Sequence, residues 1–71
     1  MKEKFSHEEY IKYSKEIKEM HNRLVSISVE VGCKLGKSRT RKVWNHIKEA
    51  NRRLVEVDWE LETIALEDEE V

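Results

Sequence analysis

Apolar residues spaced alternately three and four apart run through both halves of the chain, and this spacing constrains the fold more than any other feature. We call these fourteen residues the seam: Tyr10, Tyr13, Ile17, Met20, Leu24, Ile27 and Val31 in the first half, and Val43, Ile47, Ala50, Leu54, Val57, Leu61 and Ile64 in the second. The repeat places one apolar stripe along an α-helix, as the a and d positions do in a coiled coil. The sequence therefore predicts two long helices and an all-α fold.

Residues with capping chemistry mark the ends of these helices. Ser6 and Glu9 form a capping box, which predicts that the first helix begins next to Ser6. Gly36 suits the left-handed conformation that ends a helix, with Gly32 as an alternative end, and Ser38 suits the N-cap of the second helix. The expected organisation is a single helical-hairpin domain, 1–71, with one helix at about 7–35, a turn at about 32–38, a second helix at about 39–66 and a solvated acidic tail at 67–71.

The short connection makes the two helices antiparallel neighbours. A chain of 71 residues builds only a small core of its own, and with Cys33 as its single cysteine it cannot form an internal disulfide. The three histidines, His7, His21 and His46, have no metal-site spacing, so oligomerisation is the expected source of added stability. We therefore expect an antiparallel two-helix hairpin that assembles into a homodimeric four-helix bundle.

A second set of apolar residues lies away from the seam on both predicted helices. We call it the tryptophan face, and its members are Ile11, Val25, Val29, Trp44, Val55, Trp59 and Leu66. Single exposed apolar residues are normal on a protein surface. Two tryptophans on one face of a short chain instead favour an interface with a second copy or with a protein partner. We expect a homo-oligomer, with a dimer as the first choice.

Charge is strongly segregated along the chain although the net charge is only −1. Residues 34–53 carry eight basic side chains and one acidic side chain, whereas residues 56–71 carry eight acidic side chains and no basic one. This layout opposes the macrodipole of the second helix, which favours acidic groups at its start and basic groups at its end. An antiparallel second hairpin, an anion bound near the turn, or screening by solvent would each offset the cost.

The basic turn is the alternative functional feature. Its candidate residues for binding an anion or a nucleic acid are Lys37, Ser38, Arg39, Arg41, Lys42, Arg52 and Arg53. Phosphate backbones bind such clusters through release of counterions. A solvated basic face is the competing interpretation. The segment 32–38 is one residue shorter than a phosphate-binding P-loop and follows a helix rather than a strand, so nucleotide hydrolysis is not expected.

No group of residues has the spacing of a catalytic, metal or cofactor site, so we expect a protein that is not an enzyme and holds no cofactor. No apolar run approaches the roughly 20 residues that cross a membrane, and the charged start of the chain leads into no apolar segment. We therefore expect a cytoplasmic protein that does not bind membranes.

In length and layout, the predicted hairpin is similar to the Rop family of small plasmid RNA-binding regulators, which are dimers of helical hairpins. The resemblance includes no residue motif, so it implies no functional residues here. The expected function is that of a self-associating, non-enzymatic interaction protein or small regulator. The alternative is a nucleic-acid-binding regulator that uses the basic turn.

Overall fold

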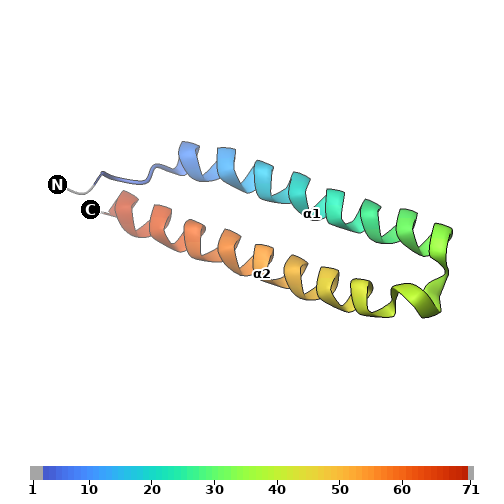
Figure 1. The fold of residues 1–71 in the computed structure, drawn as a ribbon. Helices are drawn as coiled ribbons and strands as arrows, with labels where there is room; N and C mark the ends of the chain where they lie inside the picture. Colours follow the sequence, from blue (N-terminus) through green and yellow to red (C-terminus); the bar gives the residue numbers. More distant parts are fainter. Residues whose placement is uncertain (1–2, 71) are drawn as a thin grey trace.

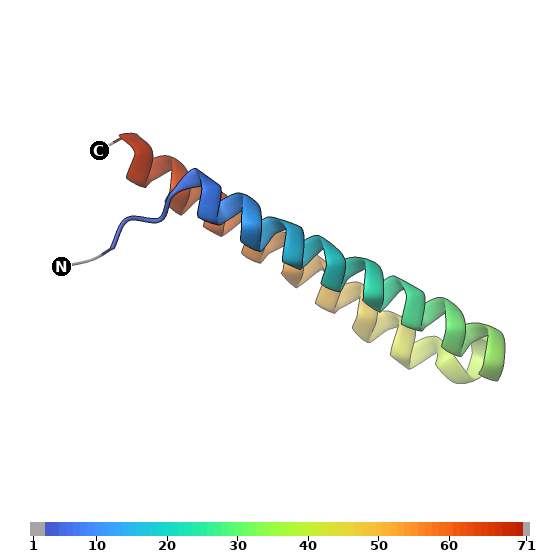
Figure 2. The ribbon, with the colours of Figure 1, turned by 90° about the horizontal axis from the view of Figure 1, so that it is seen from above.

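The computed structural model describes residues 3–70, which form two antiparallel helices joined by a single residue (Figure 1). Helix α1 spans His7–Leu35 and helix α2 spans Lys37–Glu70. The helices lie side by side in Figure 1, and in Figure 2, seen from above, α1 lies over α2 along most of its length. The start of α1 lies beside the end of α2 (Figure 1). The predicted all-α helical hairpin is confirmed. Residues 67–70 belong to α2, although the sequence predicted a solvated tail there.

The start of the hairpin is fixed by capping and by a contact with the far end of α2. The Ser6 hydroxyl oxygen accepts a hydrogen bond from the Glu9 backbone N–H at 3.1 Å, so the predicted N-cap is confirmed. The Phe5 ring stacks on Tyr13 with centroids 6.1 Å apart. The Phe5 backbone N–H donates to a carboxylate oxygen of Asp68 at 2.6 Å. Residues 5 and 68 therefore lie at the same level of the hairpin.

The turn is tighter than the sequence predicted. Gly36 ends α1 with a φ of 86°, and its N–H donates to the Gly32 carbonyl at 2.9 Å. Because Gly32 lies inside α1, the alternative end at that glycine is wrong. Helix α2 begins at Lys37, so Ser38 lies in its first turn and the predicted N-cap is also wrong. The Thr40 hydroxyl, in a side chain only 2% exposed, donates to the Gly36 carbonyl at 2.9 Å and closes the turn.

The helices meet along a stripe that follows the seam only at alternate positions. This contact stripe comprises Tyr10, Ser14, Ile17, His21, Leu24, Ser28 and Val31 in α1, and Thr40, Ile47, Asn51, Leu54, Asp58, Leu61, Ala65 and Asp68 in α2. Small side chains such as Ser14, Ser28 and Ala65 are buried in it and let the backbones approach closely. Six of the seven intervening seam residues lie one position before a stripe residue, and Val43 lies one position before Trp44. The seam therefore does not pack between the two helices at these positions.

The contact stripe forms a thin and partly polar core. Among the described residues, the buried hydrophobic side chains are Tyr10, Ile17 and Ala65. The Tyr10 hydroxyl donates to carboxylate oxygens of Asp58 at 3.2 Å and of Glu62 at 3.3 Å. Burying carboxylates beside a phenol contributes less than burying apolar surface of the same size. Packing between α1 and α2 therefore contributes little to the stability of the hairpin.

Candidate functional site

The displaced seam residues form an apolar row on one side of the hairpin. We call it the flanking row: Tyr13, Met20, Ile27, Val43, Ala50, Val57 and Ile64. Five members are exposed, including Met20 at 49%, while Ile27 and Ala50 are half-buried. Two antiparallel helices that lie side by side are related by a two-fold rotation about an axis perpendicular to the plane of the hairpin. This rotation keeps each face of the hairpin on its own side. Residues that precede the contact stripe by one position therefore lie on the same face in both helices. The flanking row is therefore one continuous surface.

A shallow apolar hollow links the two helices on this side. Tyr13, Glu16, Ile17 and Met20 of α1 line it together with Phe5 and with Leu61 of α2. Its volume is about 300 Å³. Side chains of both helices thus share one solvent-facing apolar surface, which fits the placement of the flanking row.

Six residues of the tryptophan face lie one position after a contact-stripe residue, on the side opposite the flanking row, and Trp44 lies between Thr40 and Ile47. All seven of its predicted residues are exposed, from 38% for Val55 to 62% for Trp59. The structure brings Val29 and Trp44 together near the turn. Trp59 and Leu66 lie farther along α2, toward its acidic end, so they are not part of that cluster. The seven residues therefore form an extended surface rather than one pocket.

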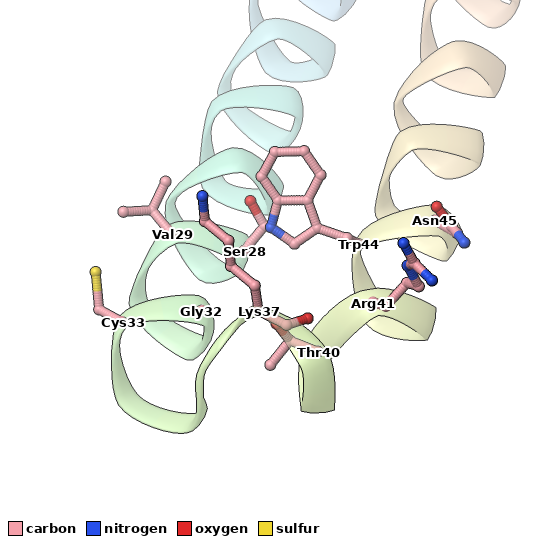
Figure 3. Close-up of a pocket in the computed structure, with 9 residues that line it drawn as sticks. All are labelled: Ser28, Val29, Gly32, Cys33, Lys37, Thr40, Arg41, Trp44 and Asn45. Atoms are coloured by element: carbon pink, nitrogen blue, oxygen red, sulfur yellow. The ribbon is translucent and has the colours of Figure 1, made fainter.

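A groove of about 700 Å³ opens on the tryptophan face beside the turn (Figure 3). The Trp44 indole extends from α2 toward Ser28 on α1, and the side chains of Lys37 and Arg41 lie at the same groove (Figure 3). A Cβ atom added to Gly32 would meet nothing within 4 Å, so this glycine leaves the groove open without any packing need within the hairpin. Sequence reasoning did not assign Gly32 or Ser28 to a surface. A glycine inside a long helix was the available signal.

The predicted anion site divides into two groups in the structure. Lys37, Ser38, Arg39, Arg41 and Lys42 are all exposed within the first turns of α2, and none forms an ion pair with another described residue. Arg52 and Arg53 instead pair with carboxylates of their own helix. The distances are 2.9 Å from Arg52 to Glu49, and 3.5 and 3.0 Å from Arg53 to Glu49 and Glu56. Of these two groups, the one at the turn has cations that form no ion pair with a described residue and could contact a ligand.

Tyr10 is a titratable side chain whose pKa the fold shifts. Burial raises the pKa of the Tyr10 phenol above its ordinary value of 10.0, and the neighbouring carboxylates Asp58 and Glu62 raise it further, while a Ser14 hydrogen bond partly offsets the shift. This phenol stays neutral and structural at physiological pH. The described residues contain no cluster of three or more His, Cys, Asp or Glu side chains suited to a metal ion. Cys33 is exposed and carries a free thiol.

Comparison of the chain with protein-family models, with curated proteins and with solved structures finds no match. Among the described residues, neither helix combines the length and the hydrophobicity that crossing a membrane requires. Function is therefore inferred from the chain's own surfaces: the flanking row, the tryptophan face and the basic turn.

Proposed function

We propose that this protein is a self-associating, non-enzymatic interaction protein whose functional unit is a homodimeric four-helix bundle. The observation that carries the proposal is the flanking row, the half of the seam that faces solvent. Apolar residues at heptad spacing face solvent along both helices, while small and polar residues alternate with apolar ones in the contact between them. A second copy that covers the flanking row would complete the core that the hairpin lacks.

The orientation of the seam supports a bundle rather than an isolated pair. At about 100° per residue, the centre of the seam points about 50° away from the contact stripe, and to the same side in both helices. In a square four-helix bundle the a and d positions point at the bundle centre, about 45° from the line to each neighbour. The hairpin therefore has the geometry of half a bundle.

The exposed area is consistent with a missing partner. The hairpin exposes 6252 Å². A compact monomer of this size would expose only about 4,700 Å². A standard interface buries about 800 Å² on each partner. The surplus is thus large enough to supply one subunit's share of an interface.

Sedimentation velocity at about 10 μM tests the proposal, with a dimer as the expected species. Met20→Glu places a charge in the flanking row and should yield a monomer, because an unpaired charge in an apolar interface is costly. Val25→Glu is the matched control, since Val25 has similar exposure on the tryptophan face, and it should remain a dimer. A monomeric wild-type protein would refute the proposal.

The tryptophan face is the proposed site for a protein partner of this dimer. It carries two large aromatic side chains and a groove beside the turn, and aromatic residues are enriched at the centres of interfaces. With the second copy on the flanking row, this face stays accessible. The dimer would then act as a small adaptor that presents two tryptophan faces.

The alternative function is nucleic-acid binding by the basic turn, supported by cations there that form no ion pair with another described residue. In that case affinity for a duplex should fall steeply as salt rises, because bound counterions are released. The double substitution Arg39→Ala plus Arg41→Ala should reduce the salt slope by about 2. An unchanged affinity in that variant would remove the basic turn from consideration.

A further inference from the structure

We infer that the second copy lies antiparallel on the flanking row, with its turn at the opposite end and with a two-fold axis passing near Met20. This inference rests on the proposed self-association and specifies its geometry. Three features of the chain agree on it: the spacing of the apolar layers, the register of the hairpin, and the charges beside the row.

The apolar layers are exchanged by a single two-fold rotation. In α1, Tyr13 and Ile27 each lie seven residues from Met20, so Tyr13 would meet the second copy's Ile27 while the two methionines meet each other. In α2, the same rotation would pair Val43 with Ile64 and Ala50 with Val57, because both pairs share a midpoint between residues 53 and 54. Each large side chain thus finds an apolar partner, and a two-fold interface requires this self-complementarity.

The hairpin register places both midpoints at one level. Gly36 alone joins the helices, so Leu35 and Lys37 lie at the same end of the hairpin. Met20 lies fifteen residues before Leu35, and the α2 midpoint lies between sixteen and seventeen residues after Lys37, a difference of about 2 Å along the helix axis. One axis can therefore pass through Met20 and through the α2 midpoint together. Two helices with unrelated patterns would not satisfy this condition.

Charged residues next to the flanking row favour the same arrangement. Arg39, His46, Arg53, Glu60 and Glu67 recur every seven residues along α2, and all five are exposed. The central Arg53 would face the second copy's Arg53, but it pairs with Glu49 and Glu56 of its own helix, which offset that repulsion. The other four form no ion pair with another described residue. The rotation would bring Arg39 to the second copy's Glu67 and His46 to the second copy's Glu60. A parallel arrangement would instead place the basic segment 34–53 beside its equal, with seven net positive charges on each.

A spin label on the native Cys33, the chain's only cysteine, measures the orientation directly. Cys33 lies thirteen residues beyond Met20. The antiparallel dimer should therefore separate the two labels by about 40 Å at 1.5 Å per residue. A dimer with a label separation below about 25 Å would overturn the inference and leave self-association standing. A monomer by sedimentation would instead refute the proposed function itself.

Exchanging the charges of Arg39 and Glu67 tests the same antiparallel arrangement. Arg39→Glu should weaken dimerisation about tenfold at low salt, because it turns two symmetry-related attractions into repulsions. Adding Glu67→Arg should restore the dimer, since each new glutamate then meets a new arginine. In a parallel dimer the second substitution would restore nothing. Failure of that rescue would therefore overturn the antiparallel inference.

Discussion

The contact stripe and the flanking row occupy adjacent positions of the same helices but differ in composition. The contact stripe contains serine, threonine, alanine, asparagine and aspartate between its apolar residues, whereas the flanking row is apolar throughout. The comparison shows that the most apolar side of a helix need not face its nearest neighbour in the chain. In the close contact within the hairpin, small and polar residues alternate with large apolar residues, whereas a second, wholly apolar row is left for a core that one hairpin cannot complete.

The largest expected effect comes from truncating the contact stripe. Ile17 is 8% exposed, and Ile17→Ala should lower the free energy of unfolding by about 2–4 kcal/mol through lost burial and a new cavity. Denaturant titration at several protein concentrations measures this cost, which should persist at each of them. Met20→Ala is the matched change in the flanking row. Its cost should be about 0.5 kcal/mol in a dilute, monomeric sample and should grow where the copies associate.

Enlarging a small side chain also tests the difference between the contact stripe and the flanking row. Ala65 is 1% exposed in the contact stripe, so Ala65→Leu should force the helices apart and cost about 1–3 kcal/mol. Ala50→Leu adds the same atoms at a half-buried position of the flanking row, which faces solvent on one side, and should be tolerated better in the hairpin. Thermal unfolding of both variants separates the cases. Equal destabilisation by the two would contradict the division into a packed stripe and an open row.

Heptad spacing predicted the two helices and the apolar surfaces, because periodicity depends only on local helical geometry, and the short connection predicted the antiparallel order. It could not predict which edge of the seam faces the neighbouring helix, since that depends on how closely two backbones can approach. Ser14, Ser28 and Ala65 control this approach, and a search restricted to apolar residues passes over the two serines. The turn was misjudged for a related reason: the Thr40 hydroxyl supplies the closing contact that the sequence analysis assigned to Ser38.

The groove at Trp44 was also beyond the reach of the sequence. Trp44 and Gly32 belong to different helices, and only the hairpin register brings them to one groove. The tryptophan face itself was predicted from spacing, and its seven residues are exposed as a surface for a partner requires. Which partner covers it depends on chemistry outside this chain.

A smaller effect is expected from Tyr10, the polar link across the contact stripe. Tyr10→Phe removes hydrogen bonds to Asp58 and Glu62 and should cost about 1 kcal/mol. The pKa of the Tyr10 phenol is raised in the folded state, chiefly by burial. Its contribution to stability is therefore complete below pH 10.0 and is lost as the pH rises above that value toward the raised pKa. Wild-type protein should thus lose more stability than Tyr10→Phe in alkaline denaturation, and parallel curves would contradict this assignment.

The smallest effect is expected at Gly32, between the contact stripe and the groove, and it is the only predicted increase in stability. Gly32 lies within α1 and has free space around the position of a Cβ atom, so Gly32→Ala should stabilise the helix by about 0.5–1 kcal/mol. Gly36→Ala is the contrasting change and should destabilise, because its φ of 86° strains any residue with a side chain. Thermal unfolding measures both. Destabilisation by Gly32→Ala would contradict this prediction. It would mean that another group, such as a second copy covering the groove, fills the space beside Gly32 in solution.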